Sequence, residues 1–202
     1  SNIFKLAVST SEDILVLLGS DNQNKLYINR WLYGENFTKV LNSWSSFTFN
    51  SNKKILGASF IETDLYLIVA TGTGTYLEKL PFEPNFKEAN TEFEYHLDHK
   101  VTEATSGVSV AYSSGNNTTT WTLPYRTYTA MSVVGRYLAD GETSTFVSTG
   151  NSSATALKPG QVITTTTTNT NGSSATITAT GDYRLSKVII GEPFEMHYRF
   201  SQ

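Results

Sequence analysis

The stretch DILVLLGSDNQNKLYINRWLYG, residues 13–34, decides the fold class. Two short runs rich in Leu, Ile, Val and Tyr, residues 13–20 and 25–34, flank the polar linker DNQN. Short apolar runs bounded by Gly, Asn, Asp and Ser are typical of β-strands joined by turns. The stretch therefore predicts two successive strands, and nothing in it favours a helix.

Strand-like runs continue on both sides of this stretch. They cover residues 3–8, 43–50, 54–61, 64–71 and 74–82. DILV at 13–16 aligns with DLYL at 64–67, a period of about 50 residues that suits a four-stranded propeller blade. Residues 1–94 are therefore predicted to form incomplete β-propeller-like blades, about two in number. The alternative is an ordinary antiparallel meander whose hairpins resemble one another because they share turn chemistry.

The composition changes near residue 84, where Pro84 and an acidic cluster interrupt the strands. Residues 95–202 hold strand-like runs about every ten residues, which predicts a β-sandwich or small-barrel domain. Its clearest turn is TNGS at 170–173, because Asn-Gly accepts the positive φ angles of a type I′ hairpin. The Thr-rich strands beside this turn are expected to bury little, so the hairpin should project into solvent or pair with another subunit.

Composition narrows the function classes. The 202 residues carry a net charge of −3 and only 16% charged residues, which disfavours salt-dependent DNA binding. The absence of cysteine excludes disulfides and thiolate metal sites. The chain starts without Met in a strand-like run and stops just after another, so both ends are expected to be cuts through a longer protein.

The stretch EYHLDHK, residues 94–100, is the strongest candidate for chemistry. In a strand, His96 and Asp98 would share one face and could supply two metal ligands, with a third required from elsewhere. His197 would instead share a polar outer face with Glu195 and Arg199. The favoured interpretation is a polar strand at the domain junction; His96 and Asp98 remain weak metal candidates, and no cofactor is predicted.

Glycoside hydrolysis would require two carboxylates facing each other across a cleft. Glu92, Glu94 and Asp98 are near one another in sequence, but acidic residues alternating along a strand are usually a solvated face. Gly-x-Ser-x-Gly and phosphate-loop motifs are absent from the sequence. We therefore expect no enzymatic activity.

The order of several motifs is similar to that of a known family. The runs are KLYINRWLYGENFTKVLNSWSSFTF (25–49), KILGASFIETDLYLIVATGTGTYLEKLPF (54–82), YHLDHKV (95–101), NNTTTWTLPY (116–125) and SKVIIGEPFEMHYRFS (186–201). Together they resemble the tail tubular protein B, or nozzle, family of short-tailed, podovirus-type bacteriophages. Each motif is weak alone, and the specificity comes from their series across nearly the whole chain. The Thr-rich hairpin does not fit the family pattern.

The resemblance implies a structural virion protein of the phage tail, part of a hexameric nozzle ring around the DNA-exit channel. Its partners would be further copies of itself and other tail proteins such as the adapter-ring tail tubular protein, with possible host-surface contact. DNA would pass without sequence-specific binding, which suits a mildly acidic chain. The aromatic residues Trp31, Trp44, Tyr66 and Tyr76 are expected to pack within or between blades. The alternative is a carbohydrate- or receptor-binding module of a phage tail protein.

Overall fold

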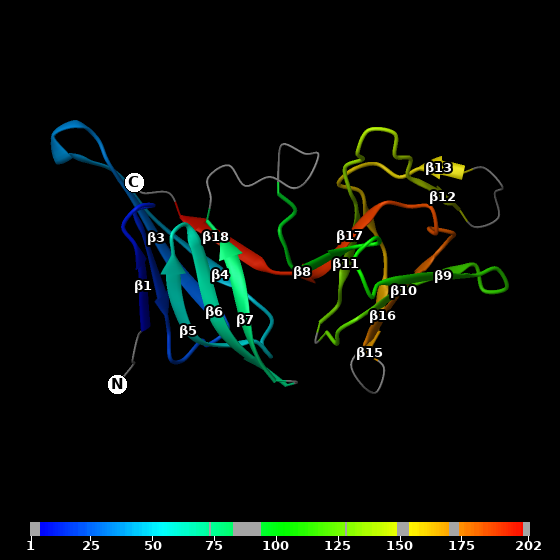
Figure 1. Ribbon diagram of the computed structural model, residues 1–202, viewed down its shortest axis with the longest axis horizontal. Coiled ribbons are helices and arrows are strands. Elements are labelled where there is room, and N and C mark those ends of the chain that lie inside the picture. Colours follow the sequence, from blue (N-terminus) through cyan, green and yellow to red (C-terminus); the bar gives the residue numbers. More distant parts are fainter. Residues whose placement is uncertain are drawn as a thin grey trace. The chain divides into compact units, whose positions relative to one another are not determined.

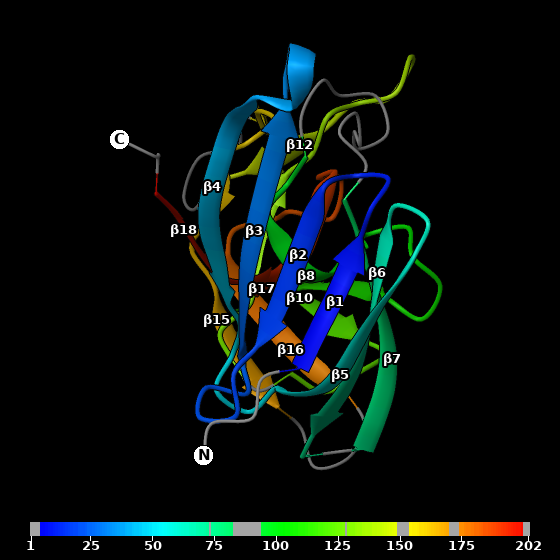
Figure 2. The same ribbon diagram turned by 90° about the vertical axis from the view of Figure 1, so that its left-hand side faces the viewer.

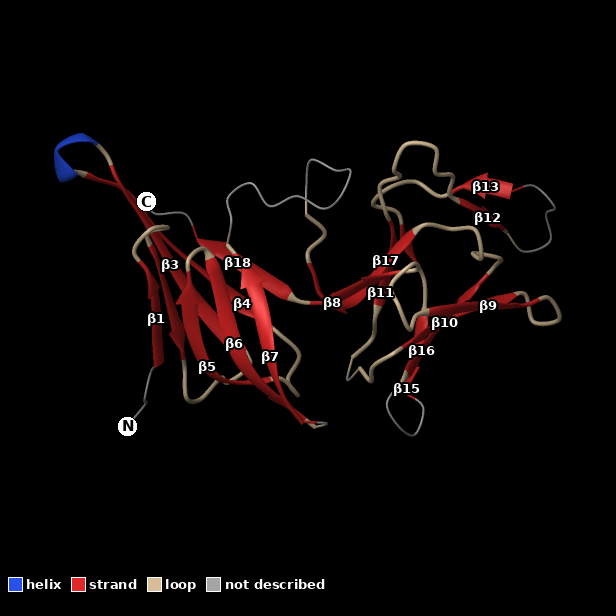
Figure 3. Ribbon diagram, in the orientation of Figure 1, coloured by secondary structure: helices blue, strands red, loops and turns tan. Residues whose placement is uncertain are grey.

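The structure is a computed structural model, and it describes residues 5–72, 74–82, 94–127, 129–148, 154–169 and 174–199. Strands dominate these residues, and the one helical turn among them is a short 3₁₀ segment, Glu35–Phe37 (Figure 3). The predicted all-β class is confirmed, and no sheet closes into a barrel. Within the same residues, no helix has the length and hydropathy that a bilayer span requires.

The chain forms two compact units. The first combines Ser1–Phe86 with Phe194–Gln202, and the second is Lys87–Pro193. The expected division into 1–94 and 95–202 gave the last strand to the second domain. That strand instead pairs with a strand of the first unit, so the chain leaves the first unit once and returns to it.

Two antiparallel sheets build the first unit (Figure 1). The five-stranded sheet has the order β1-β2-β3-β4-β18, formed by Lys5–Ser9, Ile14–Leu18, Lys25–Tyr33, Lys39–Thr48 and Glu195–Arg199. The three-stranded sheet has the order β5-β6-β7, formed by Lys54–Ile61, Asp64–Thr71 and Gly74–Pro81. The predicted strands of the first half therefore all occur, and consecutive strands pair as hairpins. Figure 2 shows β1 to β4 side by side.

The two sheets of the first unit share one apolar core. Along β2 the side chains alternate, so that Ile14, Val16 and Leu18 are buried. Leu65 and Val69 of β6 are buried in the same way and belong to the same cluster. Each sheet thus turns one face toward the common core and the other away from it.

The second unit contains the remaining strands. They are β8 (Leu97–Thr102), β9 (Ser109–Ser113), β10 (Thr118–Leu123), β11 (Ser132–Gly135), β12 (Thr145–Val147), β13 (Ala154–Ala156), β14 (Val162–Ile163), β15 (Thr166–Asn169), β16 (Ala175–Thr180) and β17 (Val188–Pro193). Two four-stranded antiparallel sheets, β15-β16-β10-β9 and β14-β11-β17-β8, contribute to one core around Trp121, and β12 pairs with β13.

The Thr-rich hairpin differs from its sequence-based description. Its predicted turn, residues 170–173, lies outside the described residues. The expectation that its strands bury little is wrong for β16, where Ala175, Ile177 and Ala179 are buried between β15 and β10. The reason is the period of two: every second residue of ATITAT is small or apolar and points inward, and the threonines lie on the other face.

Candidate functional site

The stretch 94–100 lies at the start of β8 in the second unit. The Leu97 backbone N–H donates to the Tyr95 carbonyl over 2.9 Å, which closes a tight turn around the exposed His96. His96 thus precedes the strand. The strand alternation that was expected to place His96 and Asp98 on one face therefore does not extend to His96. Asp98 lies in β8, where its Oδ1 accepts from the His99 backbone N–H over 3.1 Å. The metal role of both residues stays a prediction.

A buried carboxylate faces β8 from β17. Glu192 Oε1 accepts a hydrogen bond from Thr127 Oγ1 over 2.7 Å and lies 3.9 Å from His99 Nδ1. The Tyr125 hydroxyl donates to the His99 carbonyl over 2.7 Å. Burial raises the pKa of Tyr125, and the charges of Glu192 and Asp98 raise it further, so the hydroxyl remains a donor at neutral pH. This cluster tethers the Tyr125 loop to β8.

A second ionic cluster surrounds Arg136, just after β11. Its guanidinium donates to Glu103 (Nη2 to Oε1, 2.8 Å) and to Glu142 (Nη1 to Oε2, 2.8 Å). Glu103 Oε2 also accepts from the Val188 backbone N–H over 2.9 Å. The hydrogen bond from Arg136 lowers the pKa of Glu142 to about 2. The Arg136 bond likewise holds the pKa of Glu103 below its ordinary value, although burial of Glu103 opposes the change. The charged groups of Arg136, Glu103 and Glu142 are thus engaged in ion pairs and hydrogen bonds that stabilise the fold.

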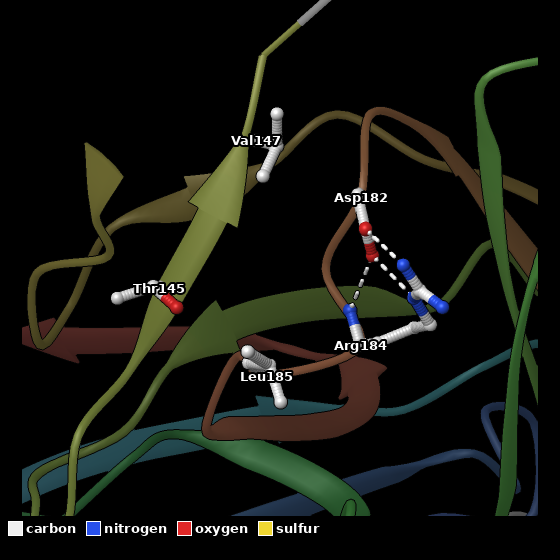
Figure 4. Close-up of a pocket in the computed structure, with 5 residues that line it drawn as sticks. All are labelled: Thr145, Val147, Asp182, Arg184 and Leu185. Carbon is white, nitrogen blue, oxygen red and sulfur yellow. Dashed lines mark hydrogen bonds and ion pairs between the residues drawn. The ribbon is translucent and has the colours of Figure 1, made fainter. Parts of the chain in front are cut away.

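A shallow depression of about 320 Å³ lies beside β12 (Figure 4). Its lining residues are Thr145, Val147, Asp182, Arg184 and Leu185. Asp182 Oδ1 accepts from Arg184 Nε over 2.9 Å and Oδ2 from Nη2 over 2.6 Å, and the guanidinium lies over the Tyr112 ring. Because both carboxylate oxygens are engaged, the pair is better suited to hold the turn after β16 than to transfer protons.

The remaining candidates from the sequence are spread over the chain. Glu94 forms an ion pair with Lys100 over 3.2 Å, and Glu92 lies outside the described residues. His197 Nε2 lies 2.8 Å from Glu195 Oε1 on the exposed strand β18 of the first unit. The structure therefore does not bring Glu94, Asp98 and His197 into one site within either unit.

The outer face of the five-stranded sheet is apolar over β1 and β2 and more polar toward β18. Two cross-strand rows define it, with Trp31 beyond them: Leu6, Leu17, Tyr27, Ser46 and His197 in one, and Val8, Leu15, Asn29, Trp44 and Arg199 in the other. Leu6 is 61% exposed, Val8 49% and Trp44 43%. A solvated antiparallel sheet normally carries polar side chains on its outer face, so this composition indicates an interaction surface.

The outer face of the β5–β7 sheet is also apolar at its centre. Ile68 of β6 pairs with Leu77 of β7, and Gly57 of β5 opposes Ile68, so no charged side chain lies in this row. Leu77 is 71% exposed. Tyr66 follows in the next row, beside the Lys79–Asp64 ion pair, whose Nζ and Oδ2 lie 2.6 Å apart. The apolar part of this face is thus one row, between neighbouring rows that contain Lys79 and Lys54.

The four aromatic residues expected to pack divide between these faces. Trp31 and Trp44 lie on the outer face of the five-stranded sheet, and Tyr66 lies on that of the β5–β7 sheet. Tyr76 pairs with Val69 in an inward row, yet it is 48% exposed on β7. None of the four is a buried core residue, so packing between blades stays a prediction. Sequence reasoning missed that leucines of β1 and β2 face outward. The signal that could have indicated this is the unbroken apolar run of β2.

Two comparisons with known proteins place the chain in a family. The tail tubular protein gp12 of Escherichia phage T7 is 24% identical over 102 residues, which are 50% of this chain and 13% of that protein. The chain therefore matches only a small part of that relative. The family described as bacteriophage nozzle protein matches residues 1–202, which is the entire chain. The protein therefore belongs to the bacteriophage nozzle protein family, as the order of its sequence motifs predicted, and its place is the virion tail.

Proposed function

We propose that this structural phage tail protein forms part of the nozzle ring around the DNA-exit channel, and that the ring is a hexamer. The observation that carries the proposal is the apolar outer face of β1 and β2, where Leu6 and Val8 are exposed beside Leu15 and Leu17. Surfaces of this kind are costly to leave in water and gain from being covered by another protein surface. A building block of a ring requires such surfaces, whereas a freely diffusing enzyme does not.

The charged groups support a structural role. Three groups of side chains in the second unit are each bonded internally. They are Arg136 with Glu103 and Glu142, Glu192 with Thr127, and Asp182 with Arg184. An active site normally keeps at least one such group available for substrate. These groups stabilise turns and strand pairs, which favours a rigid wall over a catalytic surface.

The finer architecture belongs to the same proposal. Residues 1–86 with 194–202 would be propeller-like, completed by further sheets, and residues 87–193 sandwich-like. The first part is supported by the strands of this unit, which form two antiparallel sheets around one core, and by the apolar outer face of β1 and β2. Supporting the second, two four-stranded sheets share one core. The adapter-ring tail tubular protein and the host surface are the proposed partners at the ends of the ring.

The channel role also fits the charge of the chain. A net charge of −3 gives the chain no overall electrostatic attraction to DNA. The genome would therefore slide past without sequence-specific binding. This net charge is compatible with a channel role, and the proposal itself rests on the apolar outer face that would pack in the ring.

Native mass spectrometry of the full-length protein, alone and with its neighbouring tail proteins, tests the proposal. We expect a hexamer, and electron microscopy of virions decorated with an antibody against the second unit should show label around the tail axis. A full-length protein that stays monomeric with its tail partners, or label restricted to side fibres, would contradict the ring.

A second candidate function rests on the aromatic part of the same outer face. Tyr27, Trp31 and Trp44 lie near the amides of Asn29 and Asn42, whose side chains hydrogen-bond to each other over 2.8 Å. Aromatic rings beside amides can bind sugar rings, which favours recognition of a host glycan. A glycan array probed with the protein should then show saturable binding that a Trp44→Ala variant loses. Binding that survives this change would remove the candidate.

A further inference from the structure

One sheet of the second unit has an outer face made only of small side chains. In the sheet β15-β16-β10-β9, Ile177 and Trp121 point into the core, so the alternate residues of each strand form the opposite face. Every position on it is threonine, serine or alanine, and none is buried. This hydroxyl face consists of Thr166 and Thr168 of β15, Thr176, Thr178 and Thr180 of β16, Thr118, Thr120 and Thr122 of β10, and Ser109, Ala111 and Ser113 of β9.

The outer faces of the other large sheets have a different chemistry. The five-stranded sheet is apolar over β1 and β2 and carries Arg199 on β18. The β5–β7 sheet carries Leu77 in one row and Lys79 in the next. On the outer face of the sheet β14-β11-β17-β8, Val134 is buried in a cluster with Tyr95. Among the sheets of three or more strands in the described residues, the hydroxyl face alone is exposed and lacks both charged and large apolar side chains.

We infer that the hydroxyl face lines the DNA-exit channel of the ring and that duplex DNA slides along it. This inference rests on the proposed nozzle function. Lysine and arginine bind phosphates and release counterions, and in a ring every such contact is repeated in each copy. A wall without cations does not hold DNA in this way. A large apolar surface would also be unfavourable, because the wall of an open channel stays in contact with water.

The hydrogen bonds of two threonines lower the adhesion of DNA further. A hydroxyl group has one donor hydrogen and two acceptor lone pairs. Thr176 Oγ1 donates to the Thr168 carbonyl over 3.2 Å, and Thr178 Oγ1 donates to the Thr166 carbonyl over 3.4 Å. With their hydrogens engaged, these hydroxyls present only oxygen lone pairs to the outside. Because phosphate oxygens are acceptors too, the two threonines are poorly suited to bind the DNA backbone.

The hydroxyl face is also even. Thr178 lies opposite Thr120 on one side and Thr166 on the other, so side chains of equal length form a row across three strands. Neighbouring strands lie about 4.8 Å apart, and residues on one face of a strand repeat about every 6.7 Å. No side chain longer than threonine projects from this face. A moving duplex therefore has no protruding group to displace.

The composition disfavours other occupants of the hydroxyl face. Sugar sites usually combine aromatic rings with polar groups, and stable protein interfaces have an apolar centre. The hydroxyl face has no aromatic ring and no large aliphatic side chain. It is stable in water and needs no protein to cover it. Duplex DNA that passes without being bound requires none of these contacts.

Genome ejection from virions tests the inference, with substitutions placed in the full-length protein. Thr120→Lys combined with Thr178→Lys adds two cations on paired positions of the face. Thr155→Lys is the matched control, because Thr155 is an exposed threonine of β13, outside the face. At low salt the double variant should eject DNA at least about tenfold more slowly than the control, and added salt should restore the rate by weakening phosphate contacts. Equal ejection rates at every salt concentration would overturn the inference.

Cross-linking decides the question even if the lysine variant does not assemble. The 202 residues contain no cysteine, so Thr178→Cys and Thr155→Cys each give this segment one site for a benzophenone maleimide label. In virions irradiated while ejection is arrested midway, the label at position 178 should cross-link to DNA and the label at position 155 should not. The reverse pattern, or no cross-link from either position, contradicts the inference. Saturable glycan binding that Thr120→Lys abolishes would assign the face to a sugar instead.

Failure of the inference can be separated from failure of the proposed function. Native mass spectrometry of the full-length protein shows whether a ring forms before any substitution. A ring whose hydroxyl face does not cross-link to DNA would leave the nozzle function in place and remove the inference. A full-length protein that forms no ring would contradict the proposed function itself.

Discussion

Arg136 binds two acidic side chains of the second unit. Its guanidinium holds Glu103, which is only 11% exposed, together with Glu142 on the following turn. Removing one partner of a buried ion pair costs more than the pair contributes, because a charge is left without compensation. Arg136 is therefore expected to contribute to the stability of the second unit and to its dependence on pH.

The substitution Arg136→Gln should destabilise the second unit by about 1–2 kcal/mol, because Glu103 would keep its burial, lose both hydrogen bonds from the guanidinium, and keep Lys187 Nζ, 3.5 Å away, as a weaker counter-charge. Thermal unfolding followed by circular dichroism measures the change. Arg184→Gln is the control, since the Arg184 side chain is 56% exposed and its ion pair with Asp182 should contribute less. Equal losses of stability in the two variants would show that the Arg136 cluster contributes no more than the Arg184–Asp182 ion pair.

The same cluster predicts acid sensitivity. The pKa values of Glu103 and Glu142 are lowered from 4.5 in the folded protein, so their stabilisation is fully present above that pH. It is lost as the pH falls through the folded values, which for Glu142 is about 2. Urea unfolding between pH 7 and pH 2 should show this loss, and Arg136→Gln should flatten it. A pH profile that the substitution leaves unchanged would contradict the assignment.

At the scale of elements, β17 depends on a glycine at its bulge. Its pairing with β8 shifts register between Ile190 and Glu192. A Cβ added at Gly191 would lie 2.7 Å from the Leu97 Cβ and 2.9 Å from the Asp98 carbonyl oxygen. The strand opposite contains His99 with φ of +49°, an uncommon conformation for this residue. Gly191 therefore permits the close approach that this irregular pairing requires.

Gly191→Ala should destabilise the second unit by about 1–3 kcal/mol through steric overlap with backbone that cannot move far. Gly115→Ala is the matched control, because a Cβ there meets nothing within 4 Å. Chemical denaturation of both variants gives the comparison. A Gly191→Ala variant as stable as the control would mean that β8 and β17 adjust freely.

Strand β16 tests the alternation directly. Ile177 is fully buried, whereas Thr180 on the same strand is exposed. Ile177→Ala should cost about 2–4 kcal/mol, the usual range for removing a buried branched side chain, and Thr180→Ala should be near neutral. Thermal melts of the two variants measure the difference. Similar melting temperatures would place the hairpin in solvent, as its Thr-rich sequence first suggested.

These elements show where sequence reasoning succeeds. The runs 13–20, 25–34 and 64–71 are strands, as short apolar runs bounded by turn residues predict. Glu192 and the turn at His96 were not predictable, since they depend on pairing between β8 and β17, which are far apart in the chain. The apolar outer face was present in the sequence as an unbroken LVLL run, but an unbroken run does not say what covers its second face.

At the scale of the whole molecule, chain order and spatial order differ. The second unit is inserted between β7 and β18, and β18 completes the five-stranded sheet next to β4. Phe194, just before β18, packs against Phe47 and Phe49, with ring centroids 5.5 and 5.7 Å apart. The first unit thus depends on residues that are translated after the second unit, whereas the second unit is continuous in sequence.

This connectivity predicts unequal independence of the two units. Residues 87–193 expressed alone should fold with a cooperative melt, because both of their sheets and their core are complete. Deleting residues 194–202 from the full chain should lower the melting transition of the first unit and leave that of the second unchanged, since the Phe194 contacts and an edge strand are lost. Differential scanning calorimetry resolves the two transitions.

The control restores the lost strand without the inserted unit. Residues 1–86 joined to 194–202 through a flexible Gly/Ser linker of about 15 residues, which spans roughly 20 Å on average, should recover the stability of the first unit. If the deletion instead lowers both transitions equally, the units fold as one cooperative body. If residues 1–86 alone melt like the joined chain, then β18 contributes nothing, and the return of the chain to the first sheet has no energetic role.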